Sequence, residues 1–173
     1  MEVILHPSPA LAQHAEDVDF ESDSGLLELV RTMAACMYEA SGIGLAATQI
    51  GVMKRVIVYD LGDEEPEPIA LCNPVIISRS DECEVDDEGC LSFPGISVAV
   101  ARSSGVVCEA LALDGTPVRV EAQGLQARLL QHEIDHLDGV LIIDRATPEE
   151  RKAALKRYRE AVEAGAKPGQ TSI

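Results

Sequence analysis

The first half of the chain combines one helical pattern with two short extended patterns. Between residues 24 and 41 apolar side chains recur every three or four positions, with Ser24 as the expected N-cap and Gly42 as the expected stop. Val56 to Tyr59 is a short apolar run typical of a strand, and residues 69–77 give a second strand pattern that an Asn-Pro pair interrupts. The helical pattern rests on Leu26, Leu29, Val30, Met33 and Met37.

The middle of the chain is predicted to be rich in strands with polar connections. Residues 62–68 form an acidic, proline-bearing stretch that indicates a loop, and the mostly acidic segment 81–88 is expected to be exposed. Strands are expected at 96–101, 106–113 and 118–122, with a hairpin at Asp114-Gly115 between the last two.

The last third of the chain predicts two helices. Apolar positions share one helical face after Gly124, and Gly139 ends that pattern. Residues 140–143 are rich in β-branched side chains and indicate a short strand. Thr147 is then followed by proline and by glutamate at the third position, which predicts a capped helix running to about Gly165. The few residues beyond it are expected to be loose.

This order of elements favours an α+β fold, with mostly antiparallel strands around the 124–139 helix and further helices towards both ends. A chain of 173 residues with 46% apolar and 25% charged side chains fits one ordinary globular domain. No apolar run approaches the ~20 residues that span a bilayer, and the amino terminus lacks a basic signal-like region. We therefore expect a cytoplasmic protein with no membrane partner.

Cysteine content and charge restrict the function further. Five irregularly spaced cysteines form no disulfide framework, so most should be small buried side chains in a reducing compartment. Residues 1–144 carry a net charge of −19, which argues against direct DNA binding because a phosphate backbone would be repelled. Residues 145–173 carry +3, which is typical of a solvated helix face and leaves a contact with an anionic partner open.

The 124–139 helix carries the motif His132-Glu133-x-x-His136. Histidines four positions apart lie on one helix face, so both imidazoles can bind one metal ion. A glutamate beside the first histidine can act as a general base towards water at that ion. The motif therefore indicates a hydrolytic metal site.

The third ligand of this site is not given by spacing. A metzincin would have a histidine six residues after His136, where this chain has Ile142, and a thermolysin-like site would need a glutamate from a later helix. Later glutamates exist, although the predicted strand and capped helix make that arrangement awkward. A thiolate is the remaining choice, and spacing alone does not select Cys90 over Cys83 or Cys108.

Three segments together resemble the motifs of the peptide deformylase family, in the same order and with fitting separations. They are Gly-Ile-Gly-Leu-Ala-Ala-Thr-Gln at 42–49, Glu-Gly-Cys-Leu-Ser at 88–92, and the segment that begins Gln131-His132-Glu133. The resemblance covers roughly residues 1–146 and makes them the catalytic part, with 147–173 a terminal helix and tail of the same domain. It implies hydrolysis of the N-formyl group from the initiator methionine of nascent chains, with release of formate.

Carried over position by position, the resemblance implies Cys90, His132 and His136 as ligands of one divalent metal and Glu133 as the acid and base. Gln49 and the backbone N–H of Leu91 would stabilise the oxygen of the scissile formyl group. Ferrous iron is the implied physiological ion, although a His₂Cys set also suits zinc, nickel or cobalt. The implied partners are N-formylmethionyl peptides and, through the basic terminal helix, the ribosome.

The methionine side chain of the substrate needs an apolar pocket beside the metal. Ile43 and Gly44 from the first motif, and Leu125 and Leu129 from the face of His132, are the candidates. Arg128 is placed at the rim, and Glu88 is expected to pair with an arginine such as Arg102. Ile43 could instead be core, Gly44 a helix stop and Gln49 the end of a turn. A general metallopeptidase, a non-catalytic binder of formylated termini and a structural metal site are the competing functions.

Overall fold

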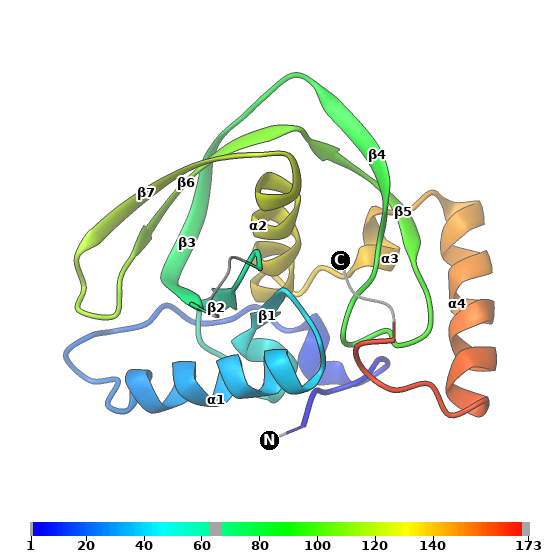
Figure 1. Cartoon of the computed structure of the whole chain (residues 1–173), viewed down its shortest axis with the longest axis horizontal. Helices are drawn as coiled ribbons and strands as arrows, with labels where there is room; N and C mark the ends of the chain where they lie inside the picture. The colour runs from blue at the N-terminus through cyan, green and yellow to red at the C-terminus, as the bar shows by residue number, and fades with distance from the viewer. Residues whose placement is uncertain (1, 63–66, 171–173) are drawn as a thin grey trace.

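The computed structural model describes residues 2–62 and 67–170, and its strands form two antiparallel sheets (Figure 1). The expectation of an α+β fold with mostly antiparallel strands is confirmed. The larger sheet has the order β1 (Gly44–Ala46), β2 (Val56–Tyr59), β3 (Ile69–Arg79), β6 (Gly105–Leu111) and β7 (Pro117–Gln123). The smaller sheet pairs β4 (Cys83–Glu88) with β5 (Val98–Ser103).

Helix α2 (Gly124–Leu137), which carries the histidine motif, lies between the two sheets (Figure 1). It contacts strands of the larger sheet as well as β5 of the smaller one. Every residue from Ala127 to Leu137 is buried, whereas a surface helix would bury only one stripe. Polar side chains of α2 are therefore enclosed and must find partners inside the protein.

The outer helices follow their sequence patterns closely. Helix α1 (Leu26–Glu39) packs its apolar face on β1 and β2, but its N-cap is Gly25 and not Ser24. Helix α4 (Pro148–Glu163) begins as predicted, because the Thr147 hydroxyl accepts a hydrogen bond from the Glu150 N–H at 3.2 Å. Two short 3₁₀ helices are also present, η1 (Pro9–Ala12) and η2 (Ala47–Ile50).

Two local predictions were wrong. Residues 140–143 do not form a strand; the chain enters a helical turn, α3 (Ile142–Arg145), because the Asp144 carboxylate accepts the Leu141 N–H at 3.0 Å. The β-branched side chains of Ile142 and Ile143 instead pack into a buried core cluster together with Ala154 and Tyr158 of α4. Residues 166–170 of the tail are not loose either, since Lys167 and Gln170 close a hydrogen-bonded turn there; the last three residues lie outside the described part of the chain.

The acidic and proline-bearing segments behave differently from one another. Segment 81–88 is largely exposed as expected, yet it forms strand β4, and only its last residue, Glu88, is buried. Strand β3 continues through the Asn-Pro pair because Asn73 takes a left-handed conformation and its side chain bonds both backbone groups of Val18. The predicted loop at 62–68 lies mainly outside the described residues.

Within the described part of the chain, no helix is long and apolar enough to cross a membrane.

Four of the five cysteines are buried, as the composition suggested, and Cys83 on β4 is exposed. Burial raises the pKa of the Cys72 and Cys108 thiols to about 11. At pH 8 each thus holds roughly a hundredfold less thiolate than an ordinary thiol, and the thiolate is the form that reacts with alkylating agents.

We therefore predict that brief iodoacetamide treatment of the folded protein modifies Cys83 and leaves Cys72 and Cys108 unmodified. Peptide mapping by mass spectrometry measures the extent of modification at each position. The same treatment in denaturant is the control and should modify all three. Equal labelling of Cys83 and Cys108 in the folded protein would contradict the burial of β6.

Candidate metal centre

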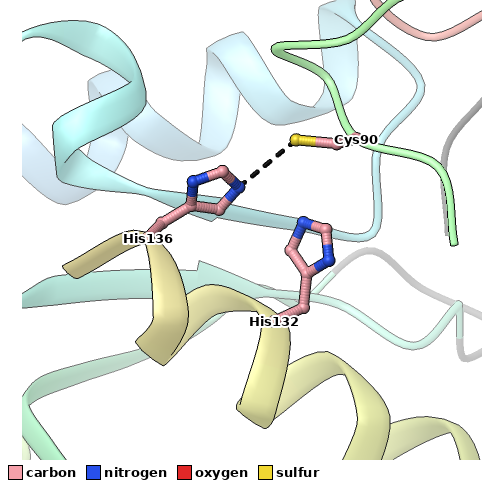
Figure 2. Close-up of side chains that lie close together, drawn as sticks. All are labelled: Cys90, His132 and His136. Atoms are coloured by element: carbon pink, nitrogen blue, oxygen red, sulfur yellow. Dashed lines mark hydrogen bonds between the residues drawn. The ribbon is translucent and has the colours of Figure 1, made fainter. Parts of the chain in front are cut away.

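Three side chains with metal-binding atoms converge below the surface of the protein. Cys90, His132 and His136 are 1–3% exposed, and their ligand atoms lie within 4.8 Å of one another. The Cys90 Sγ is 3.3 Å from the His136 Nε2 (Figure 2). Bonds of about 2.0–2.3 Å to one ion place tetrahedral ligand atoms roughly 3.3–3.8 Å apart. The Cys90–His136 spacing and the donor types of all three side chains therefore fit a zinc- or iron-type ion.

Two elements of different kinds bring these ligands together. The histidines lie one turn apart on α2, and Cys90 lies in the turn that follows β4 (Figure 2). That turn is fixed by a hydrogen bond from the Phe93 N–H to the Cys90 carbonyl at 2.9 Å. Spacing could not select this cysteine, because its position depends on how β4 and β5 fold over α2.

Glu88 orients the first histidine. Its carboxylate is fully buried and lies 3.0 Å from the His132 Nδ1, so the Nε2 of that ring is left for an ion. Burial disfavours the charge on Glu88, but hydrogen bonds from His132 and Arg102 outweigh it and hold the pKa of Glu88 well below its usual range. The same bond to Glu88, with one to Cys90, overcomes burial and raises the pKa of His132 to about 10.

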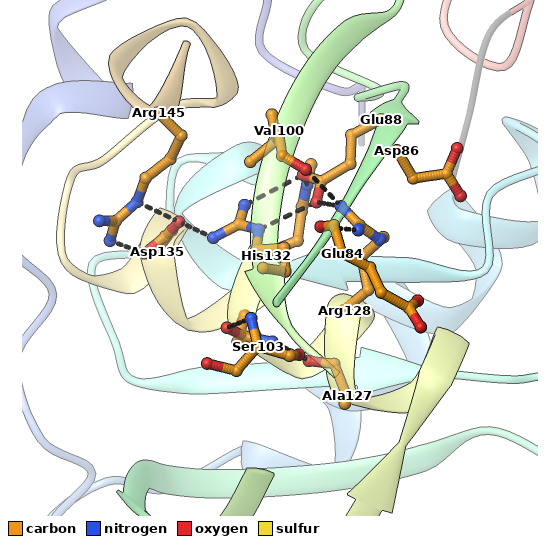
Figure 3. A network of polar contacts seen from close by, with 12 residues as sticks. Glu84, Asp86, Glu88, Val100, Ser103, Ala127, Arg128, His132, Asp135 and Arg145 are labelled. Atoms are coloured by element: carbon orange, nitrogen blue, oxygen red, sulfur yellow. Dashed lines mark hydrogen bonds and ion pairs between the residues drawn. The ribbon is translucent and has the colours of Figure 1, made fainter. Parts of the chain in front are cut away.

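Two arginines neutralise the buried Glu88 (Figure 3). Arg102 donates to both carboxylate oxygens at 2.9 and 3.0 Å, which confirms the expected pairing. Arg128 donates to Glu88 at 2.7 Å and to the Val100 carbonyl at 3.0 Å. The prediction that Arg128 lies at the rim of the substrate pocket was wrong, because the β4–β5 sheet covers it and leaves it 7% exposed.

The network extends along α2 beyond the first histidine. Asp135, a variable position of the histidine motif, bridges Arg102 and Arg145 (Figure 3). The Gln131 amide meanwhile bonds the backbone of Ser103 in both directions, at 2.9 and 3.2 Å. These contacts fix the helix against β5 on the face away from the larger sheet. No role was predicted for Asp135 from the sequence, although a carboxylate between two buried motif residues is expected to pair with a cationic side chain.

Glu133 lies beside the same centre, and one of its carboxylate oxygens has no hydrogen-bond partner among the described residues. This oxygen is Oε2, and the residue is 2% exposed. Burial raises the pKa of this carboxyl to about 7. A Cβ at Gly44 would overlap the Oε1 of Glu133, so only glycine leaves room for the carboxylate there. Gly44 is thus more than a helix stop.

Gln49 is held with its amide group towards the cysteine. Its Oε1 accepts the Ala46 N–H at 2.9 Å, and its Nε2 lies 3.2 Å from the Ser92 Oγ and 3.7 Å from the Cys90 Sγ. The neighbouring Thr48 hydroxyl donates to the His136 carbonyl at 3.2 Å, which joins η2 to the end of α2. Thr48 and Ser92 belong to the first two sequence motifs, but no role was predicted for them from the sequence.

A small pocket gives access to the centre. Ile43 and Gly44 belong to it, whereas Leu125 and Leu129 do not. Leu125 is half exposed at the start of α2, about 10 Å along the helix axis from His132, beside a different hollow. Leu129 is fully buried in the core cluster against which Ile43 packs. The pocket is lined by Gly42, Ile43, Gly44, Gln49, Gly89, Cys90, Leu91, His132 and Glu133.

Comparison with known proteins gives one consistent result. The family model described as polypeptide deformylase matches residues 1–152. The peptide deformylase of Thermodesulfovibrio yellowstonii is 41% identical over 161 residues, or 92% of this chain and 96% of the relative. The one from Natranaerobius thermophilus is 50% identical over 138 residues, covering 80% and 86%.

Solved structures agree with these matches. A peptide deformylase from Legionella pneumophila superposes with a TM-score of 0.87 and 37% identity, over 94% of this chain and 95% of the other. One from Synechococcus elongatus, in complex with actinonin, gives 0.86 and 40%, over 95% and 91%.

The buried charges around Glu88 lead to a prediction about stability. Glu88→Gln leaves the buried Arg128 without its counter-charge and leaves Arg102 with Asp135 alone, so we expect the free energy of unfolding to fall by about 3–5 kcal/mol. Urea denaturation in the presence of a chelator measures this change separately from metal binding.

The control for this variant is Glu109→Gln, which removes an exposed carboxylate that pairs with Arg119 at 3.1 Å. It should change the free energy of unfolding by at most about 0.5 kcal/mol. A Glu88→Gln variant as stable as this control would show that the buried network does not stabilise the fold.

Proposed function

The chain belongs to the polypeptide deformylase family, and from that premise we propose how its buried centre works. The enzyme is a metal-dependent hydrolase that removes formyl groups from peptides. We assign this reaction to the pocket at Cys90, with the N-formyl group on the terminal methionine of nascent chains as substrate and formate as product. The observation that carries the assignment is the convergence of a three-ligand set with Glu133, one of whose oxygens has no hydrogen-bond partner among the described residues, beside one pocket.

In this proposal Cys90, His132 and His136 hold the metal. The chemistry that such an ion supplies is a lowered pKa for water and polarisation of the formyl carbonyl. Three protein ligands leave a position open for water, which is typical of catalytic sites rather than structural ones. Glu88 supports the set by fixing the orientation of His132.

Glu133 acts as the acid and base. Its free carboxylate oxygen can accept a proton from the attacking water and return that proton to the leaving amine. A pKa near 7 suits both transfers, because the group can gain and lose a proton near neutral pH. A non-catalytic binder of formylated termini would have no use for such a residue.

Gln49 and the backbone N–H of Leu91 stabilise the oxygen of the scissile group. As the formyl carbon becomes tetrahedral its oxygen gains charge, and donors held in place beforehand stabilise that charge without reorganising. The bond between the Gln49 Oε1 and the Ala46 N–H turns the Gln49 NH₂ group towards Cys90, where the N–H that now makes only a 3.7 Å contact with the Cys90 Sγ can serve as such a donor. Ile43 borders the methionine side chain, and Gly44 keeps space for Glu133.

We propose ferrous iron as the physiological ion. The His₂Cys set also accepts zinc, nickel and cobalt, and relative affinity does not decide which metal a cell inserts. Elemental analysis after purification without oxygen, followed by formate release from formyl-Met-Ala-Ser, distinguishes these ions. A general metallopeptidase would instead cleave a blocked internal peptide, which is offered as the alternative substrate in a parallel assay.

Glu133→Gln tests the central assignment. The amide has nearly the same shape but cannot accept the proton, so we predict a fall in kcat of about 10²–10⁴ with unchanged metal content. Formate release measures turnover, and elemental analysis measures the metal.

The matched control is Glu163→Gln at the end of α4, which is exposed and should behave like the unmodified enzyme. Deformylation by Glu133→Gln at the control rate would refute the role of Glu133. Loss of metal along with turnover would mean that Glu133 serves the ligand set instead.

We also propose that the enzyme works in the cytoplasm, with residues 1–146 as its catalytic part and the terminal helix facing the ribosome. The burial of Tyr158 and Ala154 on the inner face of α4 supports placing the terminal helix in the same domain. On the outer face, Arg151 and Arg157 pair with Asp144 and Glu150. The exposed cations not engaged in such close pairs are Lys152, Lys156 and Arg159.

Reversing these three charges tests ribosome binding better than removing the helix, which would also remove the packing of Tyr158. We predict that Lys152→Glu, Lys156→Glu and Arg159→Glu together weaken co-sedimentation with ribosomes about tenfold or more, because anionic RNA would repel the new surface. Formyl-Met-Ala-Ser turnover should not change.

Reversal of Arg31, Arg79 and Arg119 is the control, since all three are exposed and the change in net charge is identical. Equal co-sedimentation of both triple variants would exclude α4 as the ribosome contact.

A further inference from the structure

The C-terminal tail turns back onto the molecule after α4. At Gly165 the backbone takes a φ of +86°, and the Ala166 N–H donates to the Ala161 carbonyl at 2.9 Å, which reverses the chain. Figure 1 shows the tail running from the end of α4 towards the turn between β4 and β5 and the end of α1. A tail that only ended the helix would make no contacts along this path.

The first contact of the tail is with the turn that carries Cys90 and Leu91. A Cβ at Gly95 in this turn would lie 2.8 Å from the Ala161 Cβ and 3.0 Å from the Ala166 Cβ. The last turn of α4 and the start of the tail therefore pack directly on the bare Cα of Gly95. This turn forms one wall of the pocket, through Cys90 and Leu91.

The second contact is with the end of α1. Gly169 abuts the backbone carbonyl of Ala40 so closely that any Cβ at position 169 would overlap it. Hydrogen bonds between Lys167 and Gln170, in both directions, hold this part of the tail in a closed turn. Two residues after Ala40 the chain reaches Gly42, which begins the other wall of the pocket.

The two walls touch each other at the pocket itself. A Cβ at Gly42 would lie 2.8 Å from the Leu91 Cδ1, so the walls are in van der Waals contact there. The tail contacts the outer end of each wall, at Ala40 and at Gly95. Tail, walls and pocket thus form a closed ring of contacts.

We propose that residues 166–169 act as a clasp that sets the width of the substrate pocket. They touch no reacting atom; they position Gly42 and Leu91 against each other, and so preorganise the pocket for the peptide. Releasing the clasp should weaken peptide binding, while His132, His136 and Glu133 are held in place by α2 and Cys90 by the hydrogen bond from the Phe93 N–H to its carbonyl. This inference rests on the proposed assignment of the pocket as the substrate site.

Gly169→Ala tests the clasp in the full-length protein. Gly165 provides a matched control, because both glycines have a φ of +86° but a Cβ at Gly165 meets no atom within 4 Å. We expect Gly169→Ala to raise the KM for formyl-Met-Ala-Ser about tenfold, and to weaken binding of the product Met-Ala-Ser equally, with kcat and metal content within about twofold. Gly165→Ala should leave both constants unchanged.

A second pair of variants removes parts of the tail, so that the contacts at Ala40 and Gly95 are lost directly. Deletion of residues 166–173 should reproduce the rise in KM, whereas deletion of 171–173 alone should not. An unchanged KM in the longer deletion, or an equal loss of kcat and metal content, would overturn the clasp. Gly44→Ala distinguishes a failure of the clasp from a failure of the proposed pocket assignment. If it retains full turnover, the pocket assignment itself fails; if it loses turnover while the tail variants behave normally, only the clasp fails.

Discussion

The burial of one carboxylate, that of Glu88, is the constraint on which the rest of the centre depends. A charge with no access to water is costly unless it is paired and hydrogen-bonded on every side. Arg102 from β5, Arg128 from α2 and the ring of His132 supply these partners. Because the partners come from both layers, the charge on Glu88 ties the smaller sheet to the helix and at the same time orients His132, a candidate metal ligand.

This arrangement explains why α2 can be buried along most of its length. Its polar residues fall into two groups, one turned to the Glu88 network and one to the pocket, and apolar residues such as Leu129 and Leu130 fill the remaining face. The first group is fully paired. In the second, Glu133 keeps an unpartnered oxygen and His136 an unpartnered Nδ1 among the described residues, and the pocket beside them is where the proposed function places the chemistry.

Periodicity alone predicted the α+β class, the motif helix, α1 and the capped start of α4, because local spacing and capping encode these features. Strand β4 was missed because its acidic residues show no apolar alternation, and its pairing with β5 supplies what the pattern lacks. Arg128 was misplaced since helical spacing gives a face of α2 but not what covers it. Among the cysteines, Cys90 was singled out by the resemblance and not by spacing, and only the folded chain brings it within 3.3 Å of His136.

The long separations within the Glu88 network also bear on how the protein folds. Glu88 and Arg102 precede Arg128 and His132 by 26 to 44 positions, so during synthesis the β4–β5 sheet leaves the ribosome before the helix that completes it. Contacts this distant in sequence form late, after the loops between them have closed. The network can therefore be complete only after the chain has been synthesised past His132, and a nascent copy that ends before α2 lacks both histidines of the centre.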